Sequence, residues 1–65
     1  MELIVKGMTC GHCEAAVQRA VKRVAPKAEV IIERARARVT VSGSDDAKGV
    51  ESAIRAEGYE VAAIE

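Results

Sequence analysis

The chain has 65 residues and a formal net charge of zero, with ten basic and ten acidic side chains. This length fits one small domain, and the charge balance disfavours a general nucleic-acid-binding role. No run approaches the roughly 18 apolar residues that a membrane span requires, which predicts no membrane insertion. Because the N-terminus shows no basic region followed by a long apolar run, we expect a cytoplasmic protein without a signal peptide.

The first two predicted elements are a strand and a helix. Residues 2–6 alternate between apolar and polar side chains, which is typical of a short strand. Apolar residues at helical spacing then predict a helix that begins at Gly11 or His12 and continues to about Val24. Pro26 ends this helix, because proline disfavours helical geometry in the residue before it.

A hairpin and a second helix are predicted next. Residues 28–33 and 37–42 are rich in β-branched side chains, and a polar turn at 34–36 joins them. Ser44 or Asp45 is the predicted N-cap of the following helix, because both residue types accept hydrogen bonds from free helical amides.

The last elements complete the order of a known motif. Gly58 suits the position just after the second helix, and residues 59–64 form a final strand. The order strand, helix, strand, strand, helix, strand is that of the ferredoxin-like βαββαβ fold. We therefore predict an α+β domain over residues 1–65, a four-stranded antiparallel sheet with both helices on one face.

The stretch GMTCGHC, residues 7–13, holds both cysteines and the only histidine. Cys10 and Cys13 lie at the predicted start of the first helix, where free backbone amides and the helix dipole favour thiolates. Thiolate is the form of cysteine that binds metals, and in a reducing cytosol a CxxC pair is more often metal-binding or catalytic than structural. The pair is therefore a candidate metal site.

The donor set narrows the choice of metal. Two thiolates suit Cu(I), whereas structural Zn²⁺ prefers four ligands and iron–sulfur clusters need four cysteines. Ag⁺ or Hg²⁺ would fit by the same softness. Thioredoxin-like disulfide chemistry also uses CxxC, but those proteins need a longer chain.

The motif GMTCGHC at residues 7–13, with EGYEV at 57–61, resembles the heavy-metal-associated domain family over the whole chain. That family includes Cu(I) chaperones of the Atx1/CopZ type and the N-terminal domains of copper-transporting P-type ATPases. The resemblance implies the βαββαβ fold and Cu(I) held by Cys10 and Cys13. It also implies that Met8 packs into the core beneath the loop and is not a ligand.

Other residues near the motif have two interpretations. Tyr59 matches a loop position near the metal where the sequence resembles bacterial chaperones, and we expect packing over the site in preference to coordination. His12 is either a third ligand or a solvent-facing imidazole, and we expect the second. We also expect Cys10 to be more exposed than Cys13, and to be the first sulfur to exchange.

The function that follows is a soluble Cu(I) metallochaperone. It would pass copper by thiolate exchange to the metal-binding domain of a copper-transporting P-type ATPase. The alternatives are an N-terminal domain excised from such an ATPase and a mercuric-ion-binding protein, and a copper-bridged homodimer is left open. No enzyme is expected, because no general base accompanies the thiols, and an RNA-binding role would need exposed aromatic side chains.

A basic surface is the candidate docking site for the partner. Residues 1–28 carry five basic and two acidic side chains, a net charge of +3. Three of these basic residues, Arg19, Lys22 and Arg23, share the exposed side of the predicted first helix. They form either a docking face for an acidic partner or an ordinary solvated surface.

Overall fold

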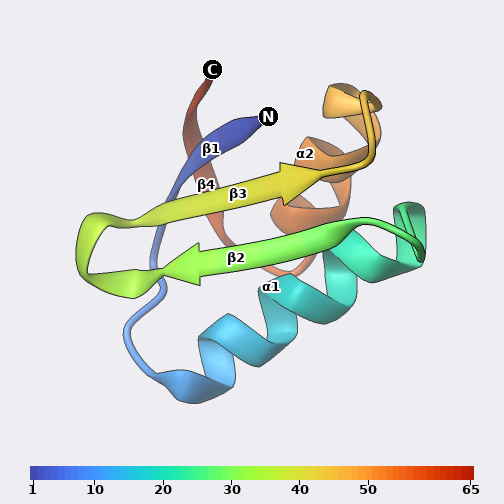
Figure 1. The fold of residues 1–65 in the computed structure, drawn as a ribbon. Helices are drawn as coiled ribbons and strands as arrows, with labels where there is room; N and C mark the ends of the chain where they lie inside the picture. The colour runs from blue at the N-terminus through green and yellow to red at the C-terminus, as the bar shows by residue number, and fades with distance from the viewer.

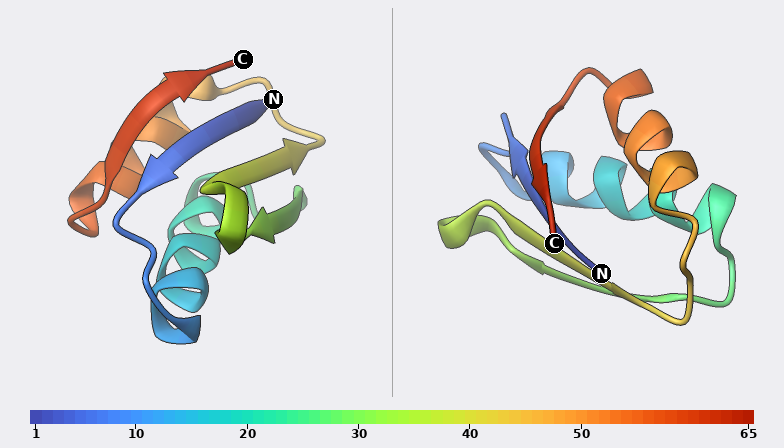
Figure 2. Two further views of the ribbon diagram at one scale, coloured as in Figure 1. Left: turned by 90° about the vertical axis from the view of Figure 1, so that its left-hand side faces the viewer. Right: turned by 90° about the horizontal axis from the view of Figure 1, so that it is seen from above.

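Four strands and two helices make up the computed structural model, which describes residues 1–65. The elements in chain order are β1 (Glu2–Lys6), α1 (Gly11–Val24), β2 (Glu29–Glu33), the single 3₁₀ turn η1 (Arg34–Arg36), β3 (Arg38–Ser42), α2 (Ala47–Ala56) and β4 (Glu60–Ile64). The strands form one sheet in the order β2-β3-β1-β4, with every neighbouring pair antiparallel. Both helices lie on one face of this sheet (Figures 1 and 2), so the predicted ferredoxin-like fold is confirmed.

The core lies between the sheet and the two helices and is built from small aliphatic side chains. Alternation along β1 and β3 turns Leu3, Val5, Val39 and Val41 toward the helices, and all four are fully buried. The helices add Val17, Ala20, Val21, Val50 and Ile54. All twelve buried residues are apolar, so none of them brings a polar side chain that needs a partner into the core.

The two chain ends lie side by side, because β1 and β4 are antiparallel neighbours in the sheet. The amide of Glu2 donates to the carbonyl of Glu65 at 3.0 Å, and the amide of Glu65 donates back to Glu2 at 2.7 Å. Figure 1 shows both ends at one side of the molecule, away from the loop between β1 and α1. The ends and that loop therefore occupy opposite sides of the domain.

The helices begin differently. Cys10 is the N-cap of α1 with an extended backbone, and no side chain caps this helix. The N-cap of α2 is Asp46, whose carboxylate accepts the amide of Gly49 at 3.0 Å. The expectation of Ser44 or Asp45 as the N-cap was wrong. Ser44 instead accepts the amide of Asp46 at 3.3 Å and so fixes the turn before the helix.

Three strands begin one residue later than predicted, for local reasons. Ala28 donates its amide to Ala25 at 3.0 Å, so it closes the turn after α1 and does not pair in the sheet. Ala37 has φ 55° and ψ 29°, in the left-handed region, which ends η1 before β3 begins. Tyr59 follows Gly58, which lies just after α2 with φ +95° as expected, and precedes β4 in a loop.

The left-handed conformation of Ala37 predicts a stabilising substitution. A Cβ atom in this conformation costs about 1–2 kcal/mol, while glycine adds about 0.5–1 kcal/mol of chain entropy to the unfolded state. Ala37→Gly should therefore raise the free energy of unfolding by up to about 1 kcal/mol, measured by urea denaturation. Ala35→Gly, within the same turn at a right-handed residue, is the matched control and should lower it. A less stable Ala37→Gly protein would contradict the prediction.

Candidate metal centre

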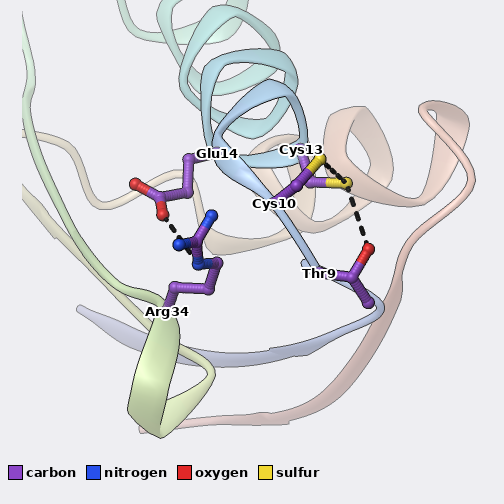
Figure 3. Close-up of polar contacts among 5 residues, drawn as sticks. All are labelled: Thr9, Cys10, Cys13, Glu14 and Arg34. Atoms are coloured by element: carbon purple, nitrogen blue, oxygen red, sulfur yellow. Dashed lines mark hydrogen bonds and ion pairs between the residues drawn. The ribbon is translucent and has the colours of Figure 1, made fainter.

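The two cysteines lie where the loop after β1 enters α1. Cys10 is exposed at the N-cap, and Cys13 is partly buried in the first helical turn, where it packs against the core. The carbonyl of Cys10 accepts the amides of Cys13 at 3.1 Å and Glu14 at 3.3 Å, which fixes the turn between them. Their sulfur atoms lie 3.7 Å apart as free thiols (Figure 3). The expected difference in exposure between the cysteines is confirmed.

Neighbouring groups favour the thiolate form of Cys13. Its pKa is lowered from 9.0 to about 6, chiefly by a hydrogen bond from the Tyr59 phenol and then by the backbone of Thr9. Cys10 lowers it further, and partial burial opposes these effects. The Thr9 hydroxyl also lies 3.9 Å from the sulfur (Figure 3). Cys13 is therefore mostly a thiolate near neutral pH, the form that a soft metal requires.

Tyr59 reaches Cys13 from the loop between α2 and β4. Its partly buried ring packs over Gly7, where an added Cβ atom would lie 3.4 Å from Cδ1. Gly7 also has φ +100°, so glycine fits the turn on both grounds. The hydrogen bond to Cys13 raises the pKa of the Tyr59 phenol, which therefore remains a protonated donor. The expectation that Tyr59 packs at the site agrees with this placement.

Tyr59→Phe is expected to raise the pKa of Cys13 above 6, because it removes the strongest donor and keeps the ring over Gly7. The measurement is the pH dependence of Cys13 alkylation in the reduced protein, mapped by mass spectrometry. Identical alkylation profiles for the two proteins would contradict this role of the phenol.

The lowered pKa of Cys13 also makes the stability of the fold depend on pH. Because the folded pKa lies below the ordinary value of 9.0, ionisation of Cys13 stabilises the fold, and this contribution is fully present above pH 9. The contribution is lost as the pH falls through 6.

Met8 and His12 occupy the predicted environments. Met8 is 8% exposed and belongs to the hydrophobic core, so its side chain packs into the core as expected. His12 is exposed, and no group of three or more His, Cys, Asp or Glu side chains is arranged to hold a metal ion. Cys10 and Cys13 are therefore the two soft side chains that the structure brings together at this loop.

Two donors to Cys13 were missed by sequence reasoning. The sequence places Tyr59 near the loop but does not indicate that its phenol lowers the pKa of Cys13. A tyrosine whose ring is partly buried generally finds a partner for its hydroxyl, and this was the available signal. The backbone of Thr9 lowers the pKa of Cys13, and its hydroxyl lies near the sulfur. A backbone contribution cannot be predicted from the type of residue, because every residue has the same backbone.

The predicted basic surface is divided among three different roles. Arg19, Lys22 and Arg23 line one open depression on α1. The ammonium of Lys22 donates to the carbonyl of Ala28, and Arg23 forms an ion pair with Glu57 at 3.4 Å. Arg19 makes no ion pair and no side-chain hydrogen bond. It is therefore the member of the set that is free to meet a partner.

The fold and the thiol pair together define a small metal-binding domain of the CxxC type. Residues 2–60 match the heavy-metal-associated domain family, and the chain belongs to that family. It is 38% identical over 63 residues to Copper-transporting ATPase 2 of Rhizobium meliloti (strain 1021), covering 92% of this chain. The match covers only 8% of that ATPase.

Solved copper chaperones share the whole architecture. The copper chaperone Atx1 from Synechocystis PCC6803 is 30% identical, with a TM-score of 0.87 and coverage of 94% of this chain and 97% of that one. A CopZ metallochaperone is 29% identical, with a TM-score of 0.84 and coverage of 94% and 96%. Neither α1 nor α2 has the length and apolar character that a membrane span requires. Family and fold together support copper binding.

Proposed function

We propose that the chain carries one Cu(I) ion on the thiolates of Cys10 and Cys13. It then delivers the ion to the metal-binding domain of a copper-transporting P-type ATPase. The observation that carries this proposal is a pair of sulfurs 3.7 Å apart with no third His, Cys, Asp or Glu side chain arranged to share a metal ion with them. Such a soft, low-coordinate site favours Cu(I) over Zn²⁺, which prefers four ligands. The likeness to copper chaperones and to part of a copper ATPase supports the same metal and partner.

The sulfur separation bears on how the ion would be held and released. At a metal–thiolate distance of about 2.3 Å, as for zinc, a 3.7 Å separation gives a sulfur–metal–sulfur angle of about 107°. Linear coordination would require about 4.6 Å, an opening of about 0.9 Å. Cys10 is the sulfur with more freedom to move, because it is exposed and precedes the helix, whereas Cys13 lies within the first turn and packs against the core. A bent site leaves room for an incoming thiolate, so exchange can pass through three sulfurs.

A metal titration tests the proposal. The fully reduced protein is titrated with Cu(I), Zn²⁺ and Hg²⁺ against a competing chelator, and X-ray absorption reports the atoms around copper. We expect one Cu(I) per chain with two sulfur neighbours, and a lower affinity below pH 6 because protons compete for the Cys13 thiolate. Tight Zn²⁺ binding with weak Cu(I) binding would overturn it, as would a copper shell of nitrogen. Selective retention of Hg²⁺ would instead favour a mercuric-ion-binding protein.

A second candidate role is that of a metal-binding domain within a copper ATPase. The observation in its favour is the 38% identity to one segment of Copper-transporting ATPase 2. The reading frame of the gene separates the two roles, because an ATPase subunit continues into membrane spans. Both roles use the same thiolate pair and the same exchange chemistry.

Docking through Arg19 gives a prediction about transfer. Arg19→Glu should slow copper transfer to an acidic partner domain on the order of three- to tenfold at low salt. At 1 M salt, where the Debye length is about 3 Å, the difference should disappear. Lys48→Glu makes the same charge change at an exposed position on α2 and is the matched control. Equal rates for the Arg19→Glu and unmodified proteins at low salt would rule out this docking surface.

A further inference from the structure

An ion pair joins the first turn of α1 to the β2–β3 connection. Glu14 follows Cys13 directly, and its Oε2 lies 3.2 Å from Nε of Arg34 in η1. Figure 3 shows this contact on one side of the turn, with the sulfur of Cys13 and Thr9 on the other. The residue pair links two segments that are 20 positions apart in sequence. Neither residue belongs to the CxxC motif.

The first turn of α1 lacks the usual means of holding a helix start. Its N-cap is Cys10, whose side chain makes no capping hydrogen bond, and the next residue is Gly11. Serine, threonine, aspartate or asparagine at an N-cap would bond a free amide, and glycine weakens a helix. The cysteine that is needed for a metal therefore leaves this turn prone to fraying.

The turn that carries Arg34 is held by backbone hydrogen bonds. Ala37, just after η1, donates its amide to Arg34 at 3.0 Å and accepts the amide of Val5 at 2.7 Å. Arg34 therefore projects from a closed turn that is bonded to the central strand of the sheet. Glu14 is 34% exposed and Arg34 43%, so the pair is partly shielded from solvent. An ion pair from this closed turn to Glu14 therefore restrains the first turn of α1.

We propose that the Glu14–Arg34 ion pair is a positioning device that keeps the CxxC turn folded before metal arrives. It acts in place of the missing N-cap and holds the Cys13 backbone from the side opposite to its sulfur. Glu14 and Arg34 are positioning residues and do not touch the ion. This inference rests on the proposed metal-binding function for its consequence, but the restraint itself exists in the metal-free protein.

The test compares Arg34→Gln and Glu14→Gln with the unmodified protein. In the metal-free reduced state, the amides of Cys13 and Glu14 should exchange with deuterium about two- to fivefold faster in both variants. Cu(I) affinity, measured against a chelator, should fall by about the same factor, because ordering of the turn becomes part of binding. Arg36→Gln is the matched control. Arg36 lies in the same turn but pairs with Glu33 at 3.9 Å within the hairpin, so both readouts should stay unchanged.

A charge swap separates restraint from simple electrostatics. If the two residues acted only through their charges on the site, Glu14→Gln and Arg34→Gln would change Cu(I) affinity in opposite directions, because they remove charges of opposite sign. The double variant Glu14→Arg with Arg34→Glu reverses both charges and would not restore the original affinity. Restraint predicts that both single variants weaken binding, and that the swap restores both affinity and amide protection to within about twofold.

The outcomes are distinct for the two proposals. Unchanged amide exchange in Arg34→Gln, or a swap that fails to restore protection, overturns the positioning role whatever the metal does. Failure of the unmodified protein to bind Cu(I) would overturn the proposed function and leave the exchange measurement valid. Faster amide exchange in both single variants, together with restored protection in the charge swap, supports the positioning role of the ion pair between α1 and the β2–β3 hairpin.

Discussion

Cys13→Ser should weaken Cu(I) binding by more than about a hundredfold. Loss of a residue that only contacts a metal ligand already costs 10- to 100-fold, and Cys13 supplies one of two proposed donors. A serine hydroxyl stays protonated near neutral pH and is a poor ligand for a soft ion. Competition between the reduced protein and a Cu(I) chelator measures the effect.

Cys10→Ser should have a comparable effect on affinity, and the double substitution should abolish binding. His12→Ala is the control, because the imidazole is exposed, and its affinity should remain within about twofold. Retention of tight copper binding by either cysteine variant would contradict the thiolate pair. A large loss in His12→Ala would instead identify histidine as a third ligand.

Met8→Ala should destabilise the domain by about 2–5 kcal/mol, because it leaves a cavity in the core beneath the metal loop. A domain of this length has a total stability of only about 3–10 kcal/mol, so this variant is expected to be partly or largely unfolded. Thermal unfolding followed by circular dichroism measures the change. The loss is expected because Met8 is 8% exposed and belongs to the hydrophobic core.

Met8→Leu separates packing from ligation. Leucine has a similar volume and no sulfur, so the cost should be below about 1.5 kcal/mol, and copper stoichiometry should be unchanged. Normal stability combined with lost copper would identify the thioether as a ligand. A cost as large as that of Met8→Ala would contradict simple volume filling.

The order of elements could be predicted because several signals agree. Alternation in 2–6 and 37–42, helical spacing before Pro26 and glycine at 58 all indicate the same architecture. The exposure of Cys10 relative to Cys13 also follows from sequence, because only Cys13 continues the apolar side of α1. Such features depend on periodicity along one element, which a sequence displays directly.

Contacts between different elements could not be predicted from the sequence. The N-cap of α2 was misplaced because three neighbouring residues, Ser44 to Asp46, all suit a cap, and only backbone geometry selects among them. The partners of Lys22 and Arg23 lie in the turn after α1 and at the end of α2. Basic residues on one helix therefore looked equivalent in sequence and differ in the fold.

The neighbouring ends of the chain, opposite the cysteines, govern how the domain tolerates being joined to something else. A linker leaving from Met1 or Glu65 departs from the side remote from Cys10, so an attached partner does not cover the thiols. Tandem copies, or one copy tethered beside a copper-transporting ATPase, would each keep the β1–α1 loop with Cys10 exposed to a partner. Tethering would also raise the effective concentration of the two domains for metal exchange. The same closeness suits circular permutation, because a short bridge would close the ends and new termini could open elsewhere.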